Sequence, residues 1–218
     1  MITLDNIELR HGARVVLSGL SGTIPSGSLT ALVGANGAGK TTLLRAIAGL
    51  HPLADGRIDR HGLRAGDIAL LAQGSHLDRS FPITCHDVVA LAATRQGPFR
   101  AIGRDRLQAT SDALARVGLA DMATRPIQAL SAGQFQRVLF ARTIVQDAKL
   151  ILLDEPFTAV DAATTHVLLS VLEDWHAQGR TVVAVLHDMD MVRRHFPNTL
   201  RLNGHAALWE IGAGLQAA

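Results

Sequence analysis

Residues 34 to 41 read Gly-Ala-Asn-Gly-Ala-Gly-Lys-Thr, and this stretch decides the fold class. It matches G-x-x-x-x-G-K-[ST], in which glycines let successive backbone N–H groups surround phosphate oxygens. The preceding segment 29–33 is apolar and strand-like, and the following segment 40–49 has a helical pattern. A phosphate-binding loop needs these flanks, because the helix N-terminus adds its positive end to the site. We therefore expect an α/β core with a phosphate site at this turn.

Each position of the loop has an expected task. The backbone that should surround the phosphates belongs to Gly34, Ala35, Asn36, Gly37, Ala38 and Gly39. Lys40 is expected to reach the β- and γ-phosphates, Thr41 to ligate Mg²⁺ through its hydroxyl, and Thr42 to add a further phosphate contact. An ordinary glycine-rich turn would not require the flanking strand and helix. The motif alone leaves ATP and GTP open.

A second candidate site segment ends an apolar strand at 150–153 and continues with Asp154, Glu155 and Pro156. A carboxylate at the end of a buried strand is costly unless it is paired or coordinated, so Asp154 is expected to act on Mg²⁺. Strand alternation would point Glu155 the other way, toward the water that attacks the γ-phosphate. Without the phosphate loop, a polar strand end leading into a turn would be the simpler interpretation.

Composition limits the class of protein. At 218 residues the chain is long enough for one sizeable core. Hydrophobic residues make up 48% and mean hydropathy is +0.21, yet the longest apolar runs, such as 181–186, are strand-sized and fall short of the roughly 18 to 20 residues of a bilayer-crossing helix. The apolar excess therefore indicates a buried parallel sheet. The N-terminus alternates like a strand and lacks the pattern of a secretory signal, so we expect a cytoplasmic location.

Charge and cysteine content exclude further classes. The net charge is +2, and the basic side is almost all arginine, scattered along the chain without dense blocks. We therefore expect no nucleic-acid partner. Cys85 is the only cysteine, so no intrachain disulfide can form. The ten histidines show no i, i+4 pair and no cluster with cysteine, so we expect no metal site made of histidines.

Hydrophobic periodicity predicts the elements. Strands are expected at 2–9, 14–17, 29–33, 68–72, 150–153, 181–186, 198–202 and 205–209. Helices are expected at 40–49, 86–95, 105–118, 133–146, 161–177 and 188–195, with Asp161 as a helix N-cap. The segment 76–146 is helical with glycine and proline connectors, which indicates a helical subdomain inserted into one domain whose core is 1–75 and 147–218.

The order of motifs resembles that of ATP-binding cassette (ABC) ATPases over nearly the whole chain. The motifs are the loop 34–41, Gln73, Leu-Ser-Ala-Gly-Gln (130–134), Leu-Leu-Asp-Glu-Pro (152–156), Ala-Val-Asp (159–161) and His187. The resemblance implies an α/β P-loop NTPase (RecA-like) core with N-terminal antiparallel β strands and an inserted helical subdomain. It also implies ATP and Mg²⁺ as cofactors.

The same resemblance implies three further site residues. Gln73 would contact Mg²⁺ or the attacking water and sense a membrane partner. Asp161 would be the aspartate of the D-loop, and His187 would be the switch histidine that contacts the γ-phosphate. Each residue type alone is more often a satisfied surface or core residue, so the shared order carries the assignment.

The segment 130–134 implies a partner. Ser131 and Gly133, followed by Gln134, begin a helix and offer a hydroxyl, N–H groups and a positive helix end to an anion. In ABC ATPases that anion is the γ-phosphate bound to another subunit, so the resemblance implies a homodimer. A simple helix N-cap by Ser131 is the alternative, and both roles can hold together.

Two positions depart from the family pattern. Ala132 stands where the family usually has a second glycine. No tyrosine is present to stack on adenine, and His11 is the expected replacement, with Val16 packing nearby.

The segment Phe81-Pro82-Ile83-Thr84, together with 154–161, resembles the ATPase subunits of zinc/manganese importers. That resemblance implies membrane permease subunits and, indirectly, a periplasmic or extracellular metal-binding protein. Phe81 and Pro82 would help to form the permease docking groove, or else anchor a buried loop. Transport of another solute or export remains open. A non-transport cassette acting on ribosomes or DNA repair is disfavoured by the absence of tandem cassettes, and a regulatory module without turnover is disfavoured by Glu155 and His187.

Overall fold

The computed structural model describes residues 1–72, 81–92, 104–203 and 206–211. The chain divides into two compact units. The first contains Met1–Gln73, Lys149–Pro156 and Leu172–Ala218, and the second contains Gly74–Ala148 and Phe157–Val171. The first unit is therefore assembled from three separate stretches of sequence.

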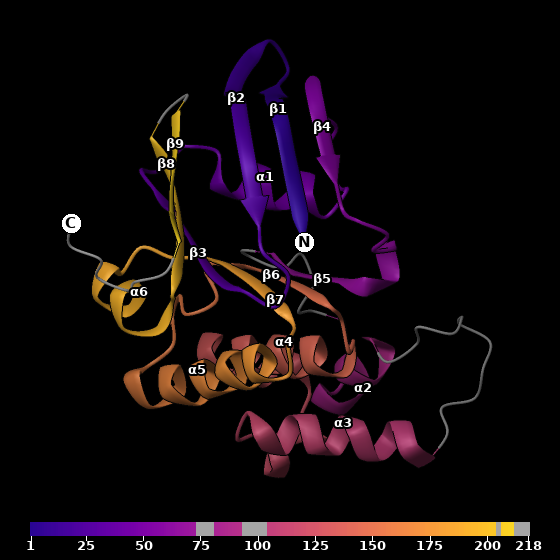
Figure 1. The fold of residues 1–218 in the computed structure, drawn as a ribbon. Coiled ribbons are helices and arrows are strands. Elements are labelled where there is room, and N and C mark those ends of the chain that lie inside the picture. Colours follow the sequence, from indigo (N-terminus) through magenta and orange to yellow (C-terminus); the bar gives the residue numbers. More distant parts are fainter. Residues whose placement is uncertain (73–80, 93–103, 204–205, 212–218) are drawn as a thin grey trace. The chain divides into compact units, whose positions relative to one another are not determined.

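An antiparallel sheet opens the first unit. It contains β1 (Ile2–His11), β2 (Arg14–Ile24) and β4 (Asp55–Asp59) in the order β2-β1-β4, and Figure 1 shows the three strands side by side. Alternation along β1, interrupted by a register shift between Leu4 and Ile7, buries one row of side chains that includes Ile2, Leu4 and Leu9. This sheet therefore has one apolar face to cover.

A six-stranded sheet forms the centre of the same unit. Its strands are β3 (Leu29–Gly34), β5 (Ile68–Leu71), β6 (Leu150–Asp154), β7 (Thr181–Val185), β8 (Asn198–Asn203) and β9 (Ala206–Ile211), in the order β5-β6-β7-β3-β8-β9. All neighbours are parallel except β8 and β9. Every residue of β6 and β7 is buried, as expected for central strands covered on both faces.

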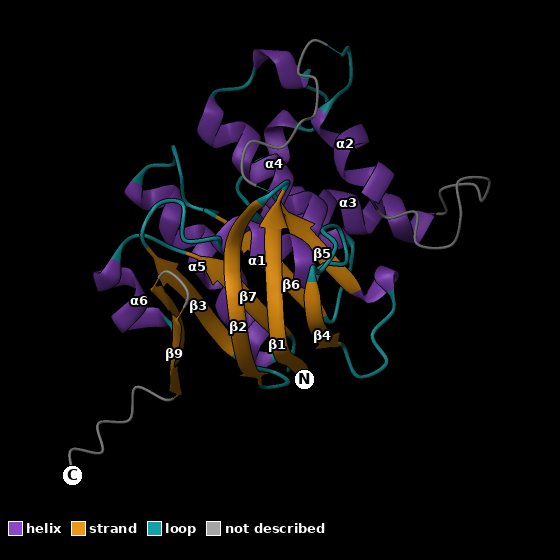
Figure 2. Cartoon of the chain, turned by 90° about the horizontal axis from the view of Figure 1, so that it is seen from above, coloured by secondary structure: helices purple, strands orange, loops and turns teal. Residues whose placement is uncertain are grey.

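The helix α1 (Lys40–Ile47) shares one apolar core with both sheets. Leu43, Leu44 and Ile47 are fully buried among side chains of β1, β2, β6 and β8. Figure 2 shows β1 and β2 side by side over α1. Since α1 follows directly on residues 34–39, this core holds the loop between β3 and the helix.

The C-terminal part of the first unit contains a short helix and the strand β9, which contacts β2. Helix α6 (Met189–His195) is capped by Asp188, whose carboxylate accepts from two backbone N–H groups of the first turn. On β9, the indole of Trp209 donates a hydrogen bond to the carbonyl of Ser21, at 3.1 Å. A Cβ at Gly22 would lie 2.2 Å from that indole, so the contact requires glycine at this position.

The second unit is helical. It contains α2 (Cys85–Ala92), α3 (Arg104–Arg116), α4 (Ala132–Val145) and the first part of α5 (Ala162–Ala177), with 3-10 turns at Ala120–Met122 and Ile127–Ala129. The remainder of α5, from Leu172, belongs to the first unit. In the described stretches of the chain, none of the helices has both the length and the apolarity to cross a bilayer.

The fold class expected from the sequence is confirmed, and three details differ. The strand β2 continues to Ile24, well past the expected end at 17. The strand β4 was not expected, because Asp-Gly-Arg-Ile-Asp is mostly polar and only Ile58 is buried. Residues 157–171 group with the helical unit, whereas the pattern placed 147–218 with the core.

Candidate functional site

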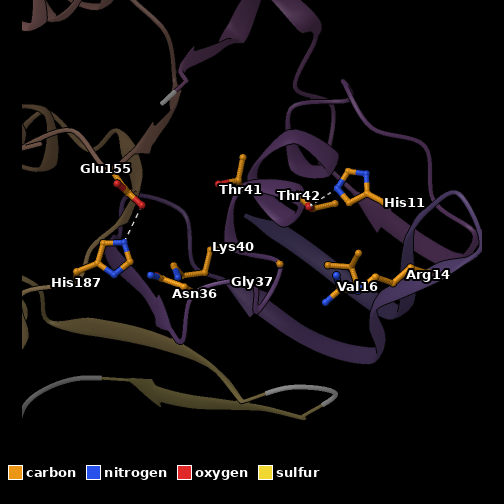
Figure 3. Close-up of a pocket in the computed structure, with 11 residues that line it drawn as sticks. His11, Arg14, Val16, Asn36, Gly37, Lys40, Thr41, Thr42, Glu155 and His187 are labelled. Atoms are coloured by element: carbon orange, nitrogen blue, oxygen red, sulfur yellow. Dashed lines mark hydrogen bonds and ion pairs between the residues drawn. The ribbon is translucent and has the colours of Figure 1, made fainter. Parts of the chain in front are cut away.

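A cavity of about 640 Å³ in the first unit contains the expected phosphate loop. Its lining residues are His11, Arg14, Val16, Asn36, Gly37, Gly39, Lys40, Thr41, Thr42, Glu155 and His187. Figure 3 shows Glu155 and His187 at one end and His11, Arg14 and Val16 at the other, with the loop residues between them. The structure thus brings nominated residues from distant segments, His11, the loop before α1, and Glu155 with His187, to one cavity.

Lys40 is held against its own loop. Its ammonium group donates hydrogen bonds to the carbonyl oxygens of Gly34 and Ala35, both at 2.9 Å. Only 6% of the residue is exposed. Burial lowers the pKa of Lys40 from its usual value of 10.5, and the charges of Glu155 and Asp154 act in the opposite direction. The two carbonyls and the two carboxylates stabilise the cation where phosphates would bind.

Glycine is required at two loop positions for different reasons. Gly39 has φ of +89°, and a Cβ there would lie 2.7 Å from Cγ1 of Val16. Gly37 has φ of +79°, but a Cβ there would meet nothing within 4 Å. Gly39 therefore permits close packing on β2, whereas Gly37 is required only by the left-handed backbone conformation.

Thr41 and Asp154 meet at the centre of the site. The hydroxyl of Thr41 donates to Oδ1 of Asp154 at 3.2 Å, and Asp154 is 2% exposed. A hydroxyl and a carboxylate oxygen at this separation are the hard ligands that Mg²⁺ prefers, and a buried carboxylate benefits from a cation beside it. The donor set therefore fits the metal that the sequence implied.

Glu155 and His187 form a hydrogen-bonded pair. Nε2 of His187 lies 2.7 Å from Oε1 of Glu155. The strand β6 ends at Asp154, and Glu155 has φ of +51°, in the left-handed region. The expectation that strand alternation separates the two carboxylates was therefore wrong in its reason, because a turn sets the direction of Glu155. Such a conformation costs about 1 to 3 kcal/mol and is concentrated at functional sites.

His11 ends β1 beside the first turn of α1. Its Nε2 is hydrogen-bonded to the hydroxyl of Thr42 at 3.1 Å. His51 meets it edge-on, with ring centroids 5.1 Å apart and an interplanar angle of 67°. His51 is fixed in turn by the carbonyl of Arg10. The imidazole of His11 is thus oriented and lines the cavity, and its contact with adenine stays a prediction.

Arg14 was missed by sequence reasoning. It is the first residue of β2, pairs with His11 across the hairpin and lines the cavity. The sequence signal that could have identified Arg14 is its position two residues before Val16, which was expected to pack near the adenine base. Residues two apart in a strand share one face. A lone arginine in a chain with scattered arginines carries little weight without the hairpin geometry.

The second unit carries the other group of nominated residues. Ser131 caps α4 by accepting from the backbone N–H of Gln134 at 3.2 Å, and the Gln134 side chain accepts from the N–H of Ser131 at 3.0 Å. This reciprocal pair is a capping box. A Cβ at Gly133 would lie 3.2 Å from the carbonyl oxygen of Ala159, and Ala132 is exposed. The glycine therefore permits a close approach, while the methyl group of Ala132 faces outward.

Asp161 caps α5, as the sequence predicted. Its Oδ1 accepts from the N–H of Thr164 at 2.7 Å. This hydrogen bond is the main reason why the pKa of Asp161 is lowered, and the charge of Arg137 contributes in the same direction. The residue thus has a structural task in the second unit, whatever its role toward a partner.

Three further nominated residues are Gln73, Phe81 and Pro82. Gln73 lies outside the described residues. Phe81 is 61% exposed and Pro82 is exposed, so neither is a buried anchor. Thr84, directly before α2, donates to the carboxylate of Asp87 at 2.6 Å. The apolar segment therefore presents its first two side chains to the surface.

Comparison with known proteins gives consistent results. A family model described as ABC transporter matches residues 17–158. The zinc transport system ATP-binding protein TroB of Treponema pallidum is 37% identical over 207 residues, covering 93% of this chain and 78% of that protein. The manganese transport system ATP-binding protein MntB of Bacillus subtilis is 36% identical over 209 residues, covering 93% and 83%.

Solved structures agree in fold. One chain, from an inward-facing transporter assigned to the metal-chelate ABC type, superposes with a TM-score of 0.81 at 28% identity, covering 96% of this chain and 82% of that one. A dimeric bacterial ABC transporter cassette superposes with a TM-score of 0.83 at 24% identity, covering 96% and 98%. The second likeness extends over nearly the whole length of both chains.

Proposed function

Because this chain belongs to the ABC transporter family, we propose that it is the ATP-hydrolysing subunit of an importer for a divalent metal ion, zinc or manganese. The main support for the proposal is that Lys40, Thr41, Glu155 and His187 line one cavity. These residues supply a phosphate-binding cation, a metal ligand, a general base and its hydrogen-bond partner. Nucleotide binding and hydrolysis follow from this set together with the family.

The triphosphate is bound by the loop between β3 and α1. Backbone N–H groups of Gly37 and Gly39 and the N-terminal end of α1 face the phosphate oxygens. Lys40 exchanges its hydrogen bonds to the loop carbonyls for bonds to the β- and γ-phosphates. Thr41 and Asp154 would hold Mg²⁺, which would supply positive charge to neutralise the charge that develops on the phosphates.

Hydrolysis is assigned to Glu155. Its carboxylate polarises the water that attacks the γ-phosphate in line with the leaving oxygen. His187, which lies 2.7 Å from that carboxylate, orients it and contacts the γ-phosphate. The family resemblance assigns Gln73, which lies outside the described residues, to the metal or the attacking water. Positioning and electrostatics carry this reaction, because phosphoryl transfer requires little other chemistry from the protein.

The site is completed by a second copy of the chain. Ser131 and Gly133, at the positive end of α4, face the γ-phosphate held by the partner copy, with Gln134 and the loop of Asp161 beside them. Ser131 and Ala132 are exposed, so this helix end is accessible to a partner copy. ATP binding then closes the dimer, and hydrolysis reopens it.

The transported ion is proposed from the relatives. Those most similar in sequence carry names of zinc, manganese or unspecified metal transport systems. Permease subunits would dock on the second unit, for which the exposed Phe81 and Pro82 offer apolar surface. A periplasmic or extracellular binding protein would supply the ion. The location would be the cytoplasmic face of the membrane, through the permease.

A deletion strain tests this function. Removing the coding gene from its host should lower cellular zinc or manganese under limitation of that metal, measured by elemental analysis. The wild-type gene should restore the content, and a gene encoding Glu155→Gln should not, although its product accumulates equally. Unchanged zinc and manganese, with a changed content of another solute or a defect in export, would contradict metal import while leaving the ATPase assignment intact.

A further inference from the structure

Arg14 occupies a defined place at the end of the nucleotide cavity. It pairs with His11 as the last pair of β1 and β2 before their turn. Residues directly opposite in an antiparallel pair have Cβ atoms about 5 Å apart on the same face. The side chains of Arg14 and His11 therefore project from one face of the hairpin, and both line the cavity.

The strand that contains Arg14 is locally irregular. The register between β1 and β2 shifts between the pairs Leu9↔Leu17 and Arg10↔Val15, which leaves Val16 outside the ladder. Register shifts of this kind redirect side chains and are frequent beside active sites. Val16 is thereby pressed against Gly39 of the phosphate loop. This contact fixes the hairpin, and with it Arg14, relative to the loop.

The guanidinium group of Arg14 is available for binding an anion. In the part of the chain that the structure describes, its guanidinium forms no hydrogen bond or ion pair. Lys40, the other permanent cation of the cavity, is already bonded to two loop carbonyls. An arginine with five free donors beside a site for a polyanion is an available ligand for phosphate oxygens.

Thr42 indicates which phosphate is within reach. It stands in the first turn of α1, where it is expected to contact a phosphate, and its hydroxyl is 3.1 Å from Nε2 of His11. Arg14 is the cross-strand neighbour of His11 and lines the same cavity as Thr42, so its guanidinium shares this end of the site with the Thr42 hydroxyl. Lys40 serves the γ-phosphate end, so this phosphate is the one nearest the base.

We propose that Arg14 binds the α-phosphate of the nucleotide and so determines how tightly the site holds ATP and ADP. This inference rests on the proposed nucleotide-binding function. Because the α-phosphate keeps its charge through hydrolysis, the contact acts on the bound ground state and on the transition state alike. Arg14 is therefore a binding residue, and its loss should raise KM and leave kcat nearly unchanged.

The test compares Arg14→Met, Arg14→Lys and the wild-type full chain by calorimetric titration with ATP, ADP and adenosine in the presence of Mg²⁺. Arg14→Met should weaken ATP and ADP binding about three- to tenfold, the range of a solvent-exposed, charge-assisted contact. Arg14→Lys should recover part of the loss, and adenosine should bind all three proteins equally. KM for ATP should rise by the same factor as the dissociation constant.

Arg57→Met is the matched control. Arg57 lies on β4 of the same sheet, pairs with Asp59 and does not line the cavity, so the variant changes net charge equally and should bind ATP as the wild type does. Equal ATP binding by Arg14→Met and wild type would overturn the inference, as would a loss that extends to adenosine. If the wild type itself bound no ATP, the proposed function would fail, and that result is distinct from an unaffected Arg14 variant.

Discussion

The carboxylate of Glu155 and the imidazole of His187 are joined by a 2.7 Å hydrogen bond, although one residue follows β6 and the other follows β7. These two strands are parallel neighbours, with Asp154 opposite Val185. Their carboxyl ends therefore deliver both side chains to the same edge of the sheet. Substitutions of Glu155 and His187 are therefore the most direct test of the proposed hydrolysis.

Replacing Glu155 with glutamine should abolish turnover while keeping ATP binding. The amide cannot accept the water's proton, so we expect phosphate release to fall by about 10²- to 10⁴-fold. Glu173→Gln, at an exposed carboxylate that meets His195, should hydrolyse ATP normally. Wild-type turnover by the Glu155 variant would remove this residue from the chemical step.

His187→Ala should also slow hydrolysis, and its effect should not add to that of Glu155→Gln. If His187 acts by orienting the carboxylate, the double variant should be no slower than Glu155→Gln alone, because residues of one network are not independent. Steady-state rates of the four proteins complete the cycle. Simple multiplication of the two defects would indicate that His187 acts separately from Glu155.

An intermolecular site predicts rescue between defective copies. Lys40→Ala removes the phosphate cation of one copy, and Ser131→Ala alters the helix end that faces the partner's nucleotide. Each variant alone should be inactive or nearly so, whereas an equimolar mixture should recover up to about a quarter of the wild-type rate, because about half of the dimers are mixed and each of these has one intact site out of two. The ATPase rate of the mixture is compared with that of each protein at the same total concentration. Lack of rescue between folded, mixed dimers would mean that one chain suffices for the site.

Two loop glycines should differ in what they contribute to folding. Gly37→Ala places an alanine in a left-handed backbone conformation and should lower the free energy of unfolding by about 1 kcal/mol. Gly39→Ala adds a methyl group 2.7 Å from Val16, so we expect a total loss of about 2 to 4 kcal/mol. Denaturant titrations of both variants without nucleotide give the comparison. Equal losses of unfolding free energy would mean that the Val16 side chain moves aside at no energetic cost.

The cap on α5 should make stability depend on pH at the acidic end. The folded state lowers the pKa of Asp161 below its usual 3.8, so its carboxylate stabilises the fold above that pH, and the effect disappears as pH falls through the lowered value. Asp161→Ala should therefore have a lower melting temperature than the wild type at pH 6. The gap should narrow below pH 4. A constant gap would assign the effect to side-chain shape instead of charge.

Local spacing explains why much of the site could be predicted. The loop 34–41 and the buried strand before Asp154 are contiguous patterns, and each carries its chemistry within a few residues. His187 could be named only through the order of the motifs. Its partnership with Glu155 depends on the parallel pairing of β6 with β7, which no local pattern encodes.

The features that escaped prediction depend on long-range packing. Asp55–Asp59 is too polar to be identified as a strand and is held by pairing with β1. The left-handed turn at Glu155 opposes the intrinsic preference of a glutamate and requires the surrounding fold. Arg14 gained its significance only when the hairpin placed it opposite His11. In each case a partner distant in sequence decides the conformation or the role.

The strand order has a consequence for synthesis on the ribosome. β3, which carries the phosphate loop, lies between β7 and β8, and both are translated late. At about 5 to 20 residues per second, the finished loop must wait on the order of ten seconds before its neighbouring strands emerge. Until then β3 has two unpaired edges, so chaperones would be needed to shield it from aggregation. ATP can stabilise only a nearly complete nascent chain, which makes nucleotide binding a late checkpoint of biogenesis.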